Sequence, residues 1–193
     1  MVKNNAHNSE TASQRLLRFQ NNGPVETIET LLNSLDNHFN NEIRVTPANF
    51  QTTLLFLGIH AVALTIGEVF FNNLNSRGRT DHFKNYKDFL EKFVDGLTDD
   101  TKFSTVSDRI HKWRNVIAHQ WISISGHGIA YDYDMRLGWI EVDGILVINP
   151  RIYCNTYLQA FKAGGKIWKY NSMFTPQELN DIHARILAKY QAQ

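Results

Sequence analysis

The sequence predicts a mainly α-helical, up-and-down bundle that carries a small antiparallel β-meander. Three observations support this fold class. Apolar residues recur at spacings of three and four through most of the chain, which is the period of an amphipathic helix. The spacing changes to two only after residue 128, which is the period of a strand. Capping residues and prolines mark the expected helix starts.

Two short helices are expected before residue 41. Ser9 or Thr11 is a suitable N-cap for the first helix, because a hydroxyl can accept hydrogen bonds from the first backbone N–H groups. The sequence Asn-Gly-Pro then interrupts the chain, and Pro24 opens the second helix at a first helical position. The second helix has a single apolar face, so we expect it to pack on one side only.

The longest helix is expected to start at Thr46-Pro47 and to run to about Asn75. It is apolar nearly all the way round, which is typical of a central helix or of one buried between two copies of the chain. Glu68 is an exception in this apolar stretch, and a carboxylate there needs a partner because an unpaired buried charge is costly. We expect Arg114 to be that partner, and a pairing with a cation elsewhere in the chain is the alternative.

The helix expected over residues 104–121 has two faces with different roles. One face is apolar and is expected to lie in the core: it carries Val106, Ile110, Trp113, Ile117 and Trp121. The other face has His111, Asn115 and His119 at positions i, i+4 and i+8, beside Arg114. Two imidazoles, an amide and a guanidinium on one helix make this ridge the candidate site.

The remaining elements follow from turn and capping signals. Asp81 is expected to cap a helix that ends at Gly96. Asp143-Gly144 is a strong two-residue hairpin signal. The whole chain is expected to form a single domain over residues 1–193. We expect it to have N-terminal helices over about 9–40, a core over about 47–122 and C-terminal helices over about 150–191. Between the core and the C-terminal helices, we expect a meander over about 129–148 that has three antiparallel strands, at 129–133, 139–142 and 145–148. Asn149-Pro150 and the capping box Thr175-Pro176-Gln177-Glu178 start the last two helices.

Composition excludes several classes of protein. With 193 residues, 42% of them hydrophobic, the chain is long enough to bury a core. A net charge of +1 argues against coating nucleic acid by bulk charge. The single cysteine, Cys154, excludes an intramolecular disulfide, and no signal-peptide pattern begins the chain, so a cytoplasmic location is expected. The longest apolar run, residues 52–71, is interrupted by His60, Gly67 and Glu68 and is too polar to span a membrane.

Arg114 and His119, with the polar Asn115 directly after the arginine, resemble the R-x(4–6)-H signature of the HEPN superfamily, the higher eukaryotes and prokaryotes nucleotide-binding domains. The likeness covers about residues 47–122. Residues 77–82, RGRTDH, satisfy the same pattern, but they lie in a turn-like segment that contains glycine. The first match lies on a long amphipathic helix flanked by tryptophans, with other apolar helices before it.

The resemblance implies a metal-independent endoribonuclease that cleaves RNA by 2′-hydroxyl transesterification, with no metal ion or other cofactor. Arg114 and His119 would be the catalytic pair, assisted by Asn115. A neutral imidazole can take the 2′-hydroxyl proton, and a guanidinium can stabilise negative charge on the phosphate. His111 and Glu68 are expected to support the site. The family also implies a toxin or defence role, and with it a cognate antitoxin protein as a partner.

A homodimer is expected as the active unit. Because each helical residue advances by about 100°, positions five apart differ by roughly 140°, so Arg114 and His119 of one chain point in different directions. A two-fold axis near Asn115 would bring the arginine of one copy towards the histidine of the other. The alternative is that the helix frays near His119 and one chain gathers both groups.

Other interpretations stay open. The chain is alternatively a noncatalytic HEPN-like dimeric module that binds RNA, a nucleotide or a protein. Arg114 and His119 are then ordinary solvated residues of a helix. A metal site is poorly supported, because His111, His119 and Glu68 lack the spacing of known ligand motifs. His60 is expected to be a core or interface histidine rather than a ligand.

Overall fold

The computed structural model describes residues 10–39, 41, 52–97, 101–120, 127–129, 137–162 and 164–192. This part of the chain is mainly helical with a small sheet, which confirms the predicted fold class at that level. The helices are α1 (Ala12–Asn21), α2 (Pro24–His38), α3 (Thr52–Phe70), α4 (His82–Phe89), α5 (Ser107–Gln120), α6 (Pro150–Phe161), α7 (Tyr170–Met173) and α8 (Pro176–Gln191). The strands are β1 (His127–Ile129), β2 (Trp139–Val142) and β3 (Ile145–Ile148).

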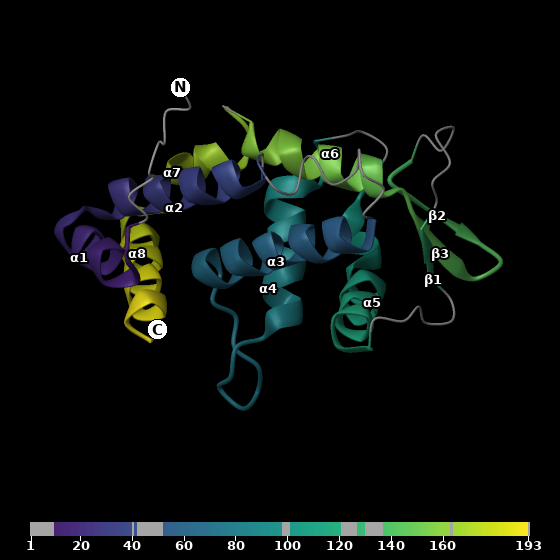
Figure 1. Ribbon diagram of the computed structural model, residues 1–193, viewed down its shortest axis with the longest axis horizontal. Helices are drawn as coiled ribbons and strands as arrows, with labels where there is room; N and C mark the ends of the chain where they lie inside the picture. Colours follow the sequence, from purple (N-terminus) through teal and green to yellow (C-terminus); the bar gives the residue numbers. More distant parts are fainter. Residues whose placement is uncertain are drawn as a thin grey trace, which may run out of the picture.

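Helix α3 lies at the centre of the molecule. It passes through the middle of the helices, while α1, α2 and α8 lie at one end and the sheet lies at the other (Figure 1). It packs against α4, α5, α6 and α8. The prediction of a central helix is therefore confirmed, and the central position explains why α3 is apolar on nearly every side.

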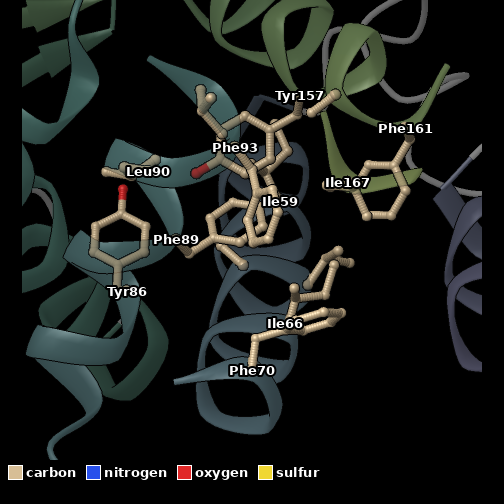
Figure 2. Close-up of a cluster of buried hydrophobic side chains, with 14 of the residues drawn as sticks. Ile59, Ile66, Phe70, Tyr86, Phe89, Leu90, Phe93, Tyr157, Phe161 and Ile167 are labelled. Atoms are coloured by element: carbon tan, nitrogen blue, oxygen red, sulfur yellow. The ribbon is translucent and has the colours of Figure 1, made fainter. Parts of the chain in front are cut away.

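The core is rich in aromatic side chains. Three buried tyrosines form a chain of hydroxyl groups inside it: the hydroxyl of Tyr153 lies 2.8 Å from that of Tyr86 and 3.0 Å from that of Tyr157. These hydrogen bonds satisfy polar groups that would otherwise be costly to bury. Figure 2 shows the cluster around α3, with Ile59, Ile66, Phe70, Tyr86, Phe89, Leu90, Phe93, Tyr157, Phe161 and Ile167.

The helix starts agree with the capping signals in the sequence. The Thr11 hydroxyl accepts a hydrogen bond from the backbone of Gln14 and caps α1. Pro24 is the first residue of α2. Asp81, Asn149 and Thr175 cap α4, α6 and α8, respectively. Local chemistry thus defines five of the eight α-helix starts in the described part of the chain.

The predicted C-terminal end of the longest helix is wrong. Helix α3 ends at Phe70, not near Asn75. Asn72 has a φ of 51°, in the left-handed region that ends helices. In addition, the Arg185 guanidinium of α8 donates hydrogen bonds to the carbonyl oxygens of Val69 and Phe70, at 2.7 and 3.1 Å. The predicted start at Thr46-Pro47 lies outside the described residues.

The sheet is mixed, so the prediction of an antiparallel meander is wrong in part. Strands β2 and β3 pair antiparallel, and Asp143 and Gly144 adopt φ values of 52° and 77° at the turn between them, as the hairpin signal predicted. Strand β1 (His127–Ile129), however, pairs parallel with β3, giving the order β1-β3-β2. A period of two identifies a strand but does not determine its neighbour. Most of the predicted strand 129–133 lies outside the described residues.

Candidate functional site

Helix α5 has the apolar face that its sequence predicts. Ile110, Trp113 and Ile117 are buried in the core. Val106 is also buried, in a short 3₁₀ turn (Phe103–Val106) that leads into α5. Trp121, the last residue of the predicted stripe, lies beyond the described part of α5. The ridge that carries His111 lies against the neighbouring helices α3 and α4, where His111 contacts His60 and Tyr86.

A pocket of about 260 Å³ lies against that ridge. It is bounded by the end of α3, the start of α4 and the middle of α5. The structure therefore brings together four of the five residues predicted for the site. The pocket is lined by Leu64, Glu68, His82, His111, Arg114 and Asn115. The backbone of His119 belongs to α5, one turn beyond Asn115, and its side chain is outside the described structure.

Asn115 contacts Arg114 directly. The Nη1 of Arg114 donates a hydrogen bond of 2.9 Å to the Oδ1 of Asn115. This bond restrains the guanidinium at the pocket wall, and it leaves the amide nitrogen of Asn115 for other partners. The Nε of Arg114 is buried and has no hydrogen-bond partner among the described residues. The residue after the arginine therefore orients that arginine.

Glu68 does not pair with Arg114, so this prediction is wrong. Its Oε1 lies 2.5 Å from the Nδ1 of His82, and its Oε2 accepts a hydrogen bond of 2.6 Å from the Nζ of Lys189. The alternative, a cation elsewhere in the chain, is confirmed. Lys189 belongs to α8, and only the packing of α8 near the end of α3 brings the two side chains together.

The pKa of Glu68 reflects this environment. Burial raises the pKa of the carboxyl group, but the hydrogen bonds from Lys189 and His82 more than offset burial and hold it below its ordinary value. Glu68 is therefore ionised at neutral pH. Its charge is balanced within its own cluster, and the guanidinium of Arg114 has no carboxylate partner among the described residues.

His111 contacts a second, fully buried histidine. The Nε2 of His60 lies 3.1 Å from the Nδ1 of His111, and the His60 ring packs on Tyr86 with 4.1 Å between ring centroids. His60 is 0% exposed, which confirms the expectation of a core histidine. Burial lowers the pKa of His60 far below its ordinary value, helped by His111 and Arg114. Burial, followed by Arg114, also lowers the pKa of His111. Both rings are neutral at pH 7.

Sequence reasoning missed two residues of this region and one contact. His82 lines the pocket, and its only signal was the second R-x-x-x-x-H match, at residues 77–82. Lys189 has no local signal, because its partner Glu68 is 121 residues away. His60 was recognised as a core histidine, but its contact with His111 was not predicted.

Within the described ranges, no three His, Cys, Asp or Glu side chains come close enough together to hold a metal ion. None of the helices in the same part of the chain has the length and apolar character needed to cross a membrane. Comparisons with protein-family models, curated proteins and solved structures find no match. The function is therefore inferred from the chemistry of the site.

Proposed function

We propose that this chain is a metal-independent endoribonuclease of HEPN-like architecture. One observation carries the proposal: Arg114 lines a pocket together with His111 and Asn115, and no described carboxylate neutralises it. A guanidinium in this situation is suited to bind a phosphate group, because its planar N–H groups match two phosphoryl oxygens. A neutral imidazole is suited to proton transfer, and the family resemblance assigns that role to His119 of the same helix.

The proposed reaction is an intramolecular transesterification. The ribose 2′-oxygen attacks the adjacent phosphorus, and the bond from phosphorus to the 5′-oxygen of the next nucleotide breaks. A histidine accepts the 2′-hydroxyl proton, and the leaving 5′-oxygen takes a proton from water. The histidine returns to its neutral form by releasing its proton to the solvent. His119 is assigned to this proton transfer, while Arg114 stabilises the charge that builds on the phosphate. The products are a 2′,3′-cyclic phosphate and a 5′-hydroxyl end.

The active unit in this proposal is a homodimer. Helix α5 is regular through Gln120, so Arg114 and His119 stand roughly 140° apart around its axis. Two copies of α5 packed about a two-fold axis near Asn115 would place Arg114 beside His119 of the partner subunit. The biological role that fits such an enzyme is that of a toxin or defence effector controlled by a cognate antitoxin, and this rests on the family resemblance.

An RNA cleavage assay tests the proposal. Single-stranded RNA is incubated with the wild type, Arg114→Ala, His119→Ala and Asn115→Ala. Lys112→Ala is the matched control, because Lys112 is exposed on the same helix and does not line the pocket. We expect Arg114→Ala and His119→Ala each to lose about 100-fold or more in rate. The Lys112 variant should stay within about twofold, since it removes no pocket group.

Two results would count against the enzyme. Equal cleavage by every variant would identify a contaminating nuclease. RNA binding by the wild type without any cleavage would favour the alternative function, a noncatalytic HEPN-like module that dimerises and binds RNA, a nucleotide or a protein.

A further inference from the structure

The contact between His60 and His111 restricts where their protons lie. Both rings are neutral, so each carries one N–H. A hydrogen bond between the Nε2 of His60 and the Nδ1 of His111 needs one donor and one acceptor. Only two arrangements satisfy this rule. In the first, His60 donates; in the second, His111 donates.

The surroundings of His60 select between the two. If His111 donated, His60 would have to carry its own proton on Nδ1. That atom is buried without a partner among the described residues. A buried N–H with no acceptor is rarer in proteins than an acceptor left without a donor. His60 therefore donates from Nε2, and its bare Nδ1 faces the core.

The first arrangement defines what His111 offers to the pocket. Its Nδ1 accepts from His60, so its proton lies on Nε2, at a different edge of the ring. His111 lines the pocket and is only half-buried, so the Nε2–H remains available there. Arg114 adds guanidinium N–H groups, and Asn115 adds its amide N–H groups, because its Oδ1 is already used by Arg114. Three side chains thus present hydrogen-bond donors to one pocket.

We propose that this pocket binds a phosphate group, and that His111 donates its Nε2–H to a phosphoryl oxygen. His60 is a positioning residue that fixes His111 in the donating tautomer. That the phosphate belongs to RNA rests on the proposed function, whereas the binding itself does not. The assignment gives His111 a role distinct from the proton transfer assigned to His119.

The charges around the pocket agree with an anionic ligand. Among the described residues of the lining, Glu68 is the acidic one, and both of its oxygens are engaged, by His82 and by Lys189. The guanidinium of Arg114 is not engaged by a described carboxylate. A phosphate therefore meets an available cation, while the carboxylate is screened by its own partners.

The test uses the full chain labelled with ¹⁵N-histidine, with inorganic phosphate as the probe. At pH 7.5, nitrogen NMR distinguishes protonated from unprotonated imidazole nitrogens. We expect His111 to be protonated on Nε2 and bare on Nδ1, and we expect added phosphate to shift its Nε2 resonance. His60→Gln keeps an amide that can donate to His111, whereas His60→Leu removes the donor. Phosphate affinity should fall about tenfold in His60→Leu. In His60→Gln it should stay within about threefold of the wild-type value.

Several outcomes decide the inference. A His111 ring protonated on Nδ1 in the wild type overturns it, and this measurement needs no variant to fold. An unchanged phosphate affinity in a folded His60→Leu protein also overturns it. Phosphate binding through His111 without RNA cleavage supports this inference and removes the proposed enzyme. RNA cleavage without any response of His111 to phosphate overturns this inference and leaves the proposed enzyme standing.

Discussion

The buried histidine pair should make the stability of the fold depend on pH. The substitution His60→Gln tests this dependence, because it keeps a polar side chain but removes the imidazole that titrates. The pKa of His60 is held well below its ordinary value of 6.5, mainly by burial. The unfolded chain therefore binds a proton at this site at a pH where the folded chain does not. Stability should be complete above about pH 7 and should fall as the pH drops below about 6.5.

The magnitude follows from proton linkage. Each proton that the unfolded state binds in excess costs about 1.4 kcal/mol of stability per pH unit. Between pH 6.5 and 5.0, His60 alone should remove at most about 2 kcal/mol from the free energy of unfolding. The neighbours of His60 are Tyr86, which packs on its ring, and His111 and Arg114, which help to lower its pKa. His111 adds a slope of its own, which should remain in the variant, because its pKa is lowered mainly by burial and by Arg114. Glu68, whose pKa lies below its ordinary value, loses its contribution only below about pH 4.5.

Urea unfolding followed by tryptophan fluorescence measures this effect. The wild type and His60→Gln are compared at several pH values from 7.5 to 5.0. We expect the two curves of unfolding free energy against pH to diverge below about pH 6.5, with the variant showing the smaller slope. His38→Gln, at an exposed position of α2, controls for the loss of a histidine as such. Parallel curves for the wild type and His60→Gln would refute the reasoning.

Three further predictions concern packing and assembly. Gly67→Ala should destabilise the fold by about 1–3 kcal/mol, because a Cβ there would lie 2.4 Å from the carbonyl oxygen of Asn85; a gain in urea midpoint would contradict this close helix approach. Tyr153→Phe should cost about 1–3 kcal/mol, because it removes the hydroxyl to which both neighbouring tyrosines are hydrogen-bonded in the core; an unchanged thermal midpoint would contradict it. A purified mixed dimer of Arg114→Ala and His119→Ala should recover part of the RNA cleavage that each homodimer lacks. No recovery in a verified mixed dimer would exclude a shared cleft.

Local signals predicted much of the fold. The structure has a helix start at each of four predicted positions: Thr11, Pro24, Asp81 and Thr175. Each of these residues favours a helix start through backbone groups within a few residues of itself. The apolar face of α5 could also be predicted from the sequence, because the helical period alone decides which side chains share a face.

Contacts between distant segments could not be predicted in the same way. Whether Glu68 pairs with Arg114 or with Lys189 depends on where α8 packs. No residue near Glu68 in the sequence indicates the position of α8. The parallel pairing of β1 with β3 is likewise a choice of neighbour, made by the tertiary fold. For the pocket, the helical spacing placed His111, Arg114 and Asn115 on adjacent ridges of one helix. The contact between His111 and the buried His60 of α3 was not predicted, because the two residues lie 51 positions apart in the sequence.

The chemistry of the cleaved RNA ends tests the proposed function most directly. The wild-type protein is incubated with RNA in EDTA, and the ends of the products are identified. Because the 2′-hydroxyl is the proposed nucleophile and a histidine takes its proton, we expect 2′,3′-cyclic phosphate and 5′-hydroxyl ends, at a rate that EDTA leaves unchanged. Cleavage that stops in EDTA and returns with magnesium, on protein that remains folded, would contradict the proposal, as would products with 5′-phosphate ends.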